Sequence, residues 1–404
     1  MHILLIHQAF VEIDEAGGTR HHELACYLAE RGHRVTIIAS PVSYLTGKAD
    51  NTASRRKQSG PGGRVTIWRT YTYKALHRSF IHRVFSFISF MASSFLAGLS
   101  VSEVDLVWGT SPPIFQGLTA WALARLKRAT FLFEVRDLWP AFAIEVGVLR
   151  NPLLIRLSNW LERFLYRHAD RVMVNSPGFI QHVQDRGARQ VELIPNGTDP
   201  RMFDPSADGV LFRQQYGLAG KYVALYAGAH GMSNDLGVAL QAAQLLADRP
   251  EIAVVLVGDG KEKPALQSQA TALGLTNVHF IPPVAKSQMG EVLAAADACI
   301  AILKPVPMYA TVYPNKVFDY LAAARPVILA IDGVIREVVE KANAGVFVPP
   351  GDPQALAEAI SYLAAQRGRG REMGLNGRHY LEQHFDRASL AEKLALLLER
   401  MNEN

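Results

Sequence analysis

Short apolar runs alternate with helix-length stretches along almost the whole chain, and this alternation limits the possible folds more than any other feature. The runs are rich in Val, Ile, Leu and Ala, are bounded by turn residues, and are typical of strands buried on both faces. Strand and helix in alternation predict mostly parallel sheets covered by helices. The expected strands are 2–7, 34–40, 65–71, 105–109, 130–135, 171–175, 191–196, 222–227, 252–257, 278–281, 298–303, 327–331 and 346–348.

The alternation falls into two series, joined by a short hinge at Pro195, Asn196 and Gly197. A chain of 404 residues is long enough for two domains. We therefore expect two doubly wound α/β domains with a cleft between them. The clearest expected helices are 19–31, 114–127, 153–168, 353–366, 371–384 and 388–400.

The composition sets wide limits on function. Two distant cysteines, Cys26 and Cys299, favour buried thiols in a reducing compartment, and no zinc-binding spacing is present. The first residues predict a strand, so we expect no signal peptide. A net charge of +5 permits an anionic substrate or an anionic membrane surface without requiring either.

Residues 313–328 predict a loop, a short helix and a buried strand. Lys316 and Asp319 lie three positions apart and share one face near the start of that helix. A cation and a carboxylate beside free backbone N–H groups suit a sugar nucleotide, since Lys316 can hold the diphosphate and Asp319 the ribose hydroxyls. The alternative is an ordinary ion pair on a surface helix.

A glycine loop at Gly17 and Gly18 follows the first strand, and Thr19 is the expected cap of the next helix. This order is a doubly wound opening, in which ligands lie at strand ends, although the spacing is not the dinucleotide fingerprint and a plain turn is the alternative. The polar stretch 46–64 is expected to be a mobile loop. Its basic run 55–57 lacks interleaved aromatic residues, so we do not expect nucleic-acid binding.

Residues 84–102 carry no formal charge and approach the length of a membrane-spanning helix. Three interpretations remain open: a buried core helix, an interfacial helix with a basic flank, and a true span. Serines within the stretch argue against a span, whereas apolar anchors beside cations favour contact with anionic lipid through residues 74–102. The basic flank consists of Lys74, His77, Arg78, His82 and Arg83.

Several motifs in a shared order carry a family resemblance. They are residues 17–20 with 32–35, 110–113, 134–140, 194–199, 258–260 and 313–328. With them the chain resembles a family 4 glycosyltransferase of the GT-B fold, and within it the fucosamine-transferase-like, colanic-acid-type branch of bacterial surface polysaccharide biosynthesis. The resemblance covers nearly the whole chain.

This resemblance implies two Rossmann-like domains facing each other across a cleft. Residues 1–198 would form the acceptor-side domain, 199–380 the nucleotide-sugar-binding domain, and 381–404 a C-terminal helix that returns to the first domain. With the pattern above, the candidate catalytic residues are Arg136, Asp137 and Lys316. The candidate donor-binding residues are Gly17, Gly18, Gly228, His230, Gly231, Lys261, Thr311, Tyr313, Asn315 and Asp319. The candidate acceptor-side residues are Arg20, Pro112 and Trp139.

The chain departs from the family pattern at three places. Arg136 stands where many relatives carry His, which favours charge stabilisation or orientation over acid–base work; an internal ion pair with Asp137 is the alternative. Thr311 replaces the first of two usual glutamates and cannot act as a carboxylate. The loop after Gly228 lacks the usual Arg or Lys, so backbone N–H groups around Gly231, with Lys316 and Lys261, would hold the diphosphate. His230 either binds phosphate or has no ligand.

The expected function is that of a retaining, metal-independent hexosyltransferase without a cofactor, with a UDP-sugar favoured as donor. The expected acceptor is a lipid-linked saccharide or polysaccharide precursor of a capsule or lipopolysaccharide. The expected location is the cytoplasm, peripherally on the inner face of the cytoplasmic membrane. The alternatives are a sugar-nucleotide epimerase on the same fold and a non-catalytic sugar-nucleotide-binding protein.

Overall fold

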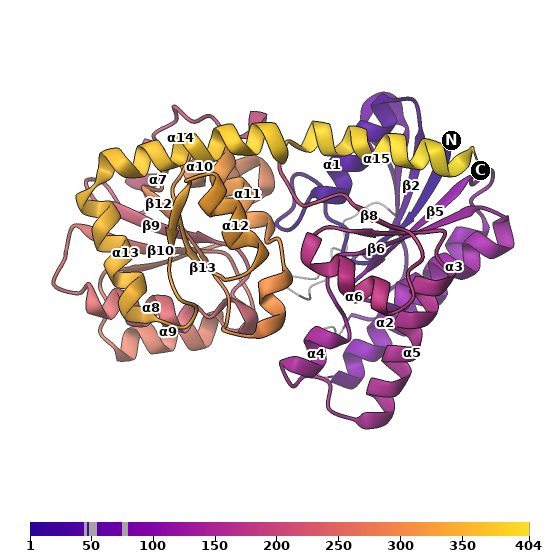
Figure 1. The fold of residues 1–404 in the computed structure, drawn as a ribbon, viewed down its shortest axis with the longest axis horizontal. Coiled ribbons are helices and arrows are strands. Elements are labelled where there is room, and N and C mark those ends of the chain that lie inside the picture. The colour runs from indigo at the N-terminus through magenta and orange to yellow at the C-terminus, as the bar shows by residue number, and fades with distance from the viewer. Residues whose placement is uncertain (44–46, 48–54, 75–79, 404) are drawn as a thin grey trace. The chain divides into compact units, whose positions relative to one another are not determined.

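The computed structural model describes residues 1–43, 47, 55–74 and 80–403, and the chain divides into two compact units (Figure 1). Unit 1 consists of Met1–Glu12, Gly18–Pro195 and Ala388–Asn404. Unit 2 consists of Ile13–Gly17 and Asn196–Arg387. The sequence put the first boundary after residue 198, and the chain changes unit after Pro195.

Within the described residues, unit 1 is built on an eight-stranded sheet in the order β3-β4-β2-β1-β5-β6-β7-β8. All neighbouring strands are parallel except β3 and β4. The strand order reverses between β1 and β5, which is where doubly wound sheets place their ligands. The strands are β1 (His2–Ile6), β2 (Arg34–Ala39), β3 (Arg56–Ser59), β4 (Val65–Arg69), β5 (Leu106–Ser111), β6 (Thr130–Val135), β7 (Arg171–Val174) and β8 (Val191–Leu193).

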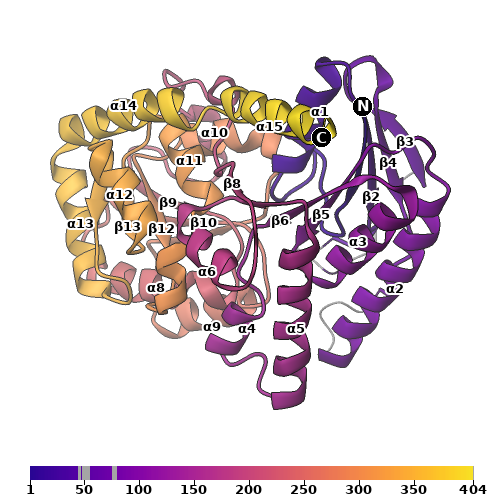
Figure 2. The ribbon, with the colours of Figure 1, turned by 45° about the vertical axis from the view of Figure 1, so that its right-hand side comes forward.

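Helices cover the sheet of unit 1, and the C-terminal helix is one of them. In α15, Leu394 and Leu398 are fully buried in one core with Ile3 and Leu5 of β1 and Leu24 of α1. Figure 2 shows α15 running beside α1. The helices are α1 (Arg20–Glu30), α2 (Phe80–Leu99), α3 (Phe115–Lys127), α4 (Ala141–Glu145), α5 (Pro152–His168), α6 (Ile180–Asp185) and α15 (Arg387–Asn402). The expected return of the C-terminal helix to the first domain is confirmed.

Two local expectations for unit 1 are wrong. The stretch 46–64 is not only a loop, because β3 pairs antiparallel with β4 and a 3-10 turn, Pro61–Gly63, follows it; residues 46 and 48–54 lie outside the described residues. Lys57 is held by Glu12 at 2.7 Å, which helps a polar segment to serve as an edge strand. Thr19 precedes α1 but does not cap its backbone, since its hydroxyl donates to Glu23 Oε1 at 2.6 Å.

Helix α2 is not a core helix. Only 22 % of its apolar window, His82–Leu99, is buried, although its length and composition would allow it to cross a membrane. It turns a narrow stripe of small residues and one Phe inward, toward α3. That stripe consists of Ser86, Phe90, Ser94 and Gly98. The opposite face carries exposed apolar side chains, among them Phe85, Ile88 and Leu96.

Unit 2 contains, among its described residues, a six-stranded parallel sheet in the order β11-β10-β9-β12-β13-β14. This order is that of a Rossmann sheet, with the reversal between β9 and β12. The strands are β9 (Tyr222–Ala227), β10 (Ile252–Val257), β11 (Val278–Ile281), β12 (Ala298–Ile302), β13 (Val327–Ala330) and β14 (Gly345–Phe347). The helices are α7 (Val210–Gln215), α8 (Leu236–Leu245), α9 (Lys263–Ala272), α10 (Met289–Ala294), α11 (Asn315–Ala322), α12 (Val334–Lys341), α13 (Pro353–Ala365) and α14 (Arg367–His384).

Both faces of the unit 2 sheet are buried, as the apolar strands predicted. In β9, Val223 and Leu225 join one core, whereas Ala224 and Tyr226 join the core on the other face.

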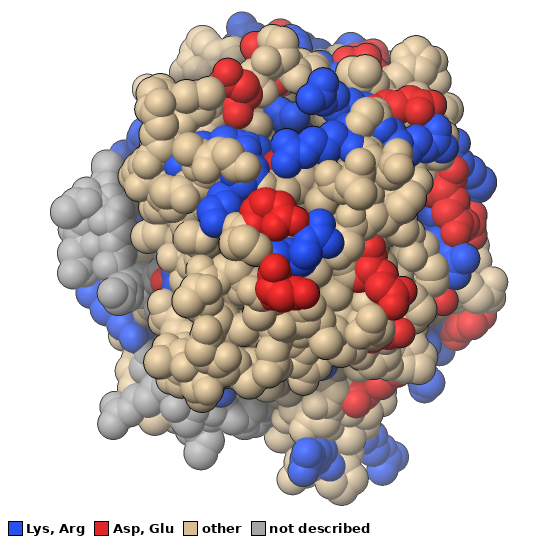
Figure 3. Space-filling model, turned by 90° about the vertical axis from the view of Figure 1, so that its left-hand side faces the viewer, with Lys and Arg blue, Asp and Glu red and all other residues tan. Residues whose placement is uncertain are grey.

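Figure 3 views one side of the molecule, where Lys and Arg form a band across the upper part and Asp and Glu lie in patches around it. Charges of both signs are therefore mixed on this side.

Replacing Leu394 with Ala tests the place of α15 in unit 1. We expect a loss of about 2–4 kcal/mol in the free energy of unfolding, because the side chain is fully buried and its removal leaves a cavity. The matched control is Leu396→Ala in the same helix, where the side chain is 46 % exposed and the expected change is within about 0.5 kcal/mol. Equal effects of the two changes in denaturant unfolding would contradict the packing.

Candidate functional site

Two glycine loops meet at the carboxyl ends of β9 and β10 in unit 2. A Cβ built on Gly258 would lie 1.9 Å from the carbonyl oxygen of Gly228, and a Cβ on Gly260 would lie 2.5 Å from that of His230. Both Gly258 and Gly260 also have positive φ angles, of 144° and 156°. Only glycine allows these backbones to approach so closely, so the two loops form one rigid rim at the strand ends.

Lys316 lies at the start of α11 with its ammonium at this rim. Its Nζ donates to the Tyr226 hydroxyl at 2.7 Å and to Asn234 Oδ1 at 3.1 Å. The same nitrogen would lie 3.1 Å from a Cβ on Gly228. Burial lowers the pKa of Lys316 to about 7, since desolvation disfavours the charged form. Its two hydrogen-bond partners are neutral, so they supply no negative charge that would oppose the shift. A desolvated ammonium with neutral partners suits an anionic ligand.

His230, on the loop that follows β9, lies beside Lys316 of α11. Its side chain is buried, and neither ring nitrogen has a hydrogen-bond partner among the described residues. Burial, with the charges of Lys263 and Lys316 adding to it, lowers the pKa of His230 to about 4, so its ring is neutral near pH 7. A neutral ring has one N–H donor and one acceptor available for a ligand.

The lysine that borders the glycine rim is Lys263, not Lys261. Lys263 Nζ donates to the carbonyl oxygen of Gly258 at 2.7 Å, whereas Lys261 is exposed. Of the two lysines on this loop, the sequence singled out Lys261, which is the exposed one. Lys263 is the first residue of α9, and its long side chain folds back over the turn.

Asp319 is paired with a lysine from a different element. Its Oδ1 accepts from Lys286 Nζ at 2.5 Å, and both side chains are largely buried. Lys286 comes from the 3-10 turn before α10, so this contact joins α10 to α11. The alternative of a simple surface pair between Lys316 and Asp319 is wrong, because the two side chains bind different partners.

The remaining candidates on this side take other positions. Thr311 donates to the carbonyl oxygen of Met308 at 2.7 Å within a 3-10 turn. Tyr313 packs its ring edge-on against Phe318, and burial raises its pKa to about 12, so its hydroxyl stays protonated. Asn315 is exposed at the start of α11, and Gly231 begins the turn Met232–Asn234 that carries Asn234 to Lys316.

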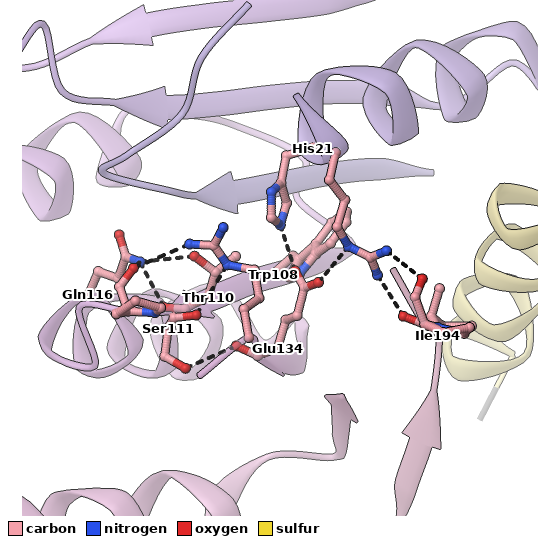
Figure 4. Close-up of polar contacts among 11 residues, drawn as sticks. His21, Trp108, Thr110, Ser111, Gln116, Glu134 and Ile194 are labelled. Atoms are coloured by element: carbon pink, nitrogen blue, oxygen red, sulfur yellow. Dashed lines mark hydrogen bonds and ion pairs between the residues drawn. The ribbon is translucent and has the colours of Figure 1, made fainter. Parts of the chain in front are cut away.

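Unit 1 is organised around the buried carboxylate of Glu134, at the carboxyl end of β6 (Figure 4). Glu134 accepts from Arg20 Nε at 3.1 Å, from His21 Nε2 at 2.6 Å and from Trp108 Nε1 at 3.1 Å. Burial alone would raise the pKa of Glu134, but His21 and Arg20 lower it to about 2. Burial lowers the pKa of His21 to about 4, so near pH 7 a neutral imidazole donates to an ionised carboxylate.

Arg20 is a structural residue in this arrangement. Besides Glu134 it binds two carbonyl oxygens, of Pro195 through NH1 and of Ile194 through NH2, each at 2.8 Å. The side chain is 3 % exposed, so its donors point inward rather than to an acceptor. It fixes the end of unit 1 immediately before the chain enters unit 2. Gly17 and Gly18 are both exposed, and the boundary between the units falls between them.

Arg136 and Asp137 follow Glu134 at the same strand end. Arg136 Nε donates to the carbonyl oxygen of Ser111 at 3.1 Å and its NH2 to that of Pro112 at 3.3 Å. Burial raises the pKa of Asp137 to about 6, although the positive charge of Arg136 opposes the shift. A carboxyl group that titrates near neutral pH is a candidate for proton transfer.

Trp139 lies at the end of a row of partly exposed aromatic rings. Its ring centroid is 5.5 Å from that of Phe115 at the start of α3, which is 5.7 Å from that of Phe87 in α2. Gln116, next to Phe115, accepts from the N–H of Gln8 at 2.6 Å and donates to the carbonyl oxygen of Thr110 at 2.8 Å. The first turn of α3 thus joins the strand ends of β1 and β5 to the aromatic row.

Several of these residues were missed at the level of sequence: His21, Trp108, Gln116, Glu134, Lys263 and Lys286. Glu134 gave a signal, because a carboxylate inside the apolar run 130–135 needs buried partners. Its partners gave none, since they come from distant parts of the chain. Among the described residues, no group of three or more His, Cys, Asp or Glu side chains could hold a metal ion.

Replacing Asp137 with Asn tests its buried carboxyl group. Because burial raises the folded-state pKa of Asp137 from 3.8 to about 6, the stabilising contribution of the protonated group is full below about pH 3.8 and is lost as pH rises from there through about 6. We expect Asp137→Asn to raise the free energy of unfolding at about pH 8, by at most about 3 kcal/mol, and to change it little at about pH 3. A variant that is equally or less stable at both pH values contradicts the shift.

Two family models match the chain. The Glycosyl transferase 4-like domain matches residues 16–197, and the Glycosyl transferases group 1 model matches residues 221–366. The putative colanic acid biosynthesis glycosyl transferase WcaI of Escherichia coli K12 is 26 % identical over 310 residues, which are 74 % of this chain and 76 % of WcaI.

Solved structures share the fold over the full length. Sucrose-phosphate synthase from Thermosynechococcus elongatus has a TM-score of 0.80 at 21 % identity, covering 99 % of this chain and 98 % of that one. Anabaena HepE in complex with UDP-glucose has a TM-score of 0.72 at 18 % identity, covering 99 % and 100 %. With its two matched domains and two Rossmann-like units, the chain belongs to the family 4 glycosyltransferases of the GT-B fold.

Proposed function

We propose that this protein transfers a sugar, with retention of configuration and without a metal, from a UDP-sugar to a lipid-linked or polysaccharide-precursor acceptor of a bacterial cell-surface glycan. The observation that carries the proposal is the partly buried ammonium of Lys316 at the glycine rim of unit 2. Two relatives support the choice of substrates: HepE was solved with UDP-glucose, and WcaI is described as a colanic acid biosynthesis enzyme.

Lys316 would bind the diphosphate of the donor and stabilise it as the leaving group. Its present partners, Tyr226 and Asn234, hold the ammonium in place without neutralising it. A charge that is already oriented and desolvated stabilises developing negative charge without further reorganisation. His230, which is neutral and has no hydrogen-bond partner among the described residues, would add an N–H donor at the same loop.

Asp319 would bind the ribose of the donor. Lys286 holds Oδ1 of this carboxylate, which leaves Oδ2 to accept from a sugar hydroxyl. Thr311, in place of the usual first glutamate, leaves the hexose to hydroxyl and backbone groups. The identity of the transferred sugar is therefore the property on which this chain should differ most from its relatives.

Arg136 and Asp137 would act on the acceptor side, with Pro112 and Trp139 beside them. Arg136 is tied to carbonyl oxygens at the end of β5, so its charge is oriented rather than mobile. Asp137, with a pKa of about 6, exists in both protonation states near neutral pH and would exchange the acceptor's proton.

A lipid-linked acceptor agrees with the exposed face of α2. Phe85, Ile88, Leu96 and Leu99 are each at least 45 % exposed and recur along one side of the helix. Phe87 of the same helix begins the aromatic row that ends at Trp139. We therefore propose that α2 lies on the inner face of the cytoplasmic membrane and holds the protein there peripherally, near the lipid end of its acceptor.

A panel of UDP-, GDP- and ADP-sugars tests the donor assignment. We expect a UDP-sugar to raise the melting temperature most, because a ligand at about a hundred times its Kd adds about 2.7 kcal/mol of stability. The selected donor, incubated alone, should stay chemically unchanged. With bacterial polyprenyl-linked saccharides present, its labelled sugar should enter the lipid fraction, with or without EDTA. Epimer formation without acceptor, or no binding by calorimetry, contradicts the proposal.

The pH dependence of donor binding tests Lys316. Its ammonium is lost as pH rises through about 7, while the diphosphate of a sugar nucleotide stays dianionic, so affinity should fall toward about tenfold per pH unit above that point. In Lys316→Arg, whose charge persists, affinity should not depend on pH between about 6 and 8.5. Lys316→Met should bind at least about tenfold more weakly at pH 6. Calorimetry with the tightest donor gives these values. A wild-type affinity independent of pH contradicts the lowered pKa, and unchanged binding by Lys316→Met removes Lys316 from the site.

A further inference from the structure

Helix α5 exposes an apolar stripe that nothing in the described part of unit 1 covers. Leu153 is 63 % exposed, Leu157 52 % and Trp160 60 %, and Leu154 lies beside them at 37 %. Spacings of four and three residues put Leu153, Leu157 and Trp160 on one line along the helix. Exposed contiguous apolar side chains on a soluble unit indicate a surface that contacts another phase or partner.

The exposed side of α5 carries charge of one sign only. Arg156 and Arg163 lie seven positions apart, on a line next to the apolar stripe, and both are exposed, as is Arg150 before the helix. The single acidic residue of α5, Glu162, points inward and is held by His182 at 2.8 Å and Arg186 at 2.9 Å. An apolar stripe with a purely cationic flank is complementary to an anionic bilayer surface.

The position of α5 agrees with that partner. Both α2 and α5 pack against α3, and both extend to the lower end of unit 1 in Figures 1 and 2, where the start of α5 projects from the unit. The start of α5 therefore lies at the end of unit 1 to which α2 also extends. Two helices with exposed apolar residues at one end can both contact one surface.

We propose that the first three turns of α5 form a second bilayer-binding element, with Trp160 and the three leucines at the acyl boundary and Arg150, Arg156 and Arg163 at lipid phosphates. The exposed side of α5 is amphipathic by itself. Its long arginine side chains can reach the lipid headgroups while the leucines lie at the acyl boundary. With α2, this element sets how unit 1 is oriented on the membrane. This element adds to the membrane contact of α2 in the proposed function, and only its biological purpose rests on that function.

Vesicle binding by the full-length protein tests the element without any donor or acceptor. The variant is Leu157→Glu, and the matched control is Leu375→Glu, at a leucine of α14 that is 59 % exposed. On vesicles of phosphatidylcholine with phosphatidylglycerol, we expect Leu157→Glu to reduce co-sedimentation by roughly tenfold or more and the control to stay within about twofold of wild type. The wild-type protein should bind vesicles of pure phosphatidylcholine more weakly. Thermal unfolding should show that both variants are folded.

A second readout follows Trp160 itself. Vesicles with brominated acyl chains should quench part of the wild-type tryptophan fluorescence, and that part should be missing in Trp160→Phe. Unchanged binding by Leu157→Glu, equal losses in both glutamate variants, or identical quenching with and without Trp160 would each overturn the proposal. Self-association in the absence of lipid that Leu157→Glu abolishes would assign the stripe to a second copy of the chain instead. Because no sugar is present, each outcome is independent of transferase activity.

Discussion

The buried charge of Glu134 is the constraint on which unit 1 depends. A carboxylate without water is costly unless it is paired and hydrogen-bonded, and here Arg20, His21 and Trp108 supply that pairing from α1 and β5. Arg20 then extends the network to Ile194, at the end of the unit. Since the candidate residues Arg136 and Asp137 lie two and three positions after Glu134, one network fixes the strand end that bears them and the point where the chain leaves the unit.

Unit 2 holds its cation in a different way. Lys316 has neutral partners and a pKa of about 7, so below that pH the folded protein keeps an ammonium that is poorly solvated and not paired with an anion. An anionic ligand relieves this cost when it binds, which converts burial into affinity for diphosphate. Because the cation comes from α11 and not from the loop after Gly228, that loop can pack closely against Gly258. The departure from the family's loop is thus compatible with the same electrostatic task.

Local pattern was sufficient to predict every described strand of the two sheets except β3, because the other strands are rich in apolar residues. It also indicated Lys316 and Asp319, which are neighbours in sequence. It could not show that Lys286 holds Asp319, since the two residues are 33 positions apart in sequence and only the folding of unit 2 brings the turn before α10 to α11. It missed β3 because an exposed edge strand carries polar residues, and it missed the stripe of α5 because the same amphipathic pattern describes a helix packed on a core.

Helix α3 connects the two proposed properties of unit 1. The helices with exposed apolar faces, α2 and α5, both pack against it. Its first residue, Phe115, touches Trp139 on the proposed acceptor side, and the next, Gln116, binds the strand ends of β1 and β5. A bilayer that holds α2 and α5 would therefore also position the acceptor side, because one rigid helix separates them. An acceptor with a lipid anchor could then reach Trp139 while its lipid stays in the membrane, so that binding to the bilayer raises its effective concentration.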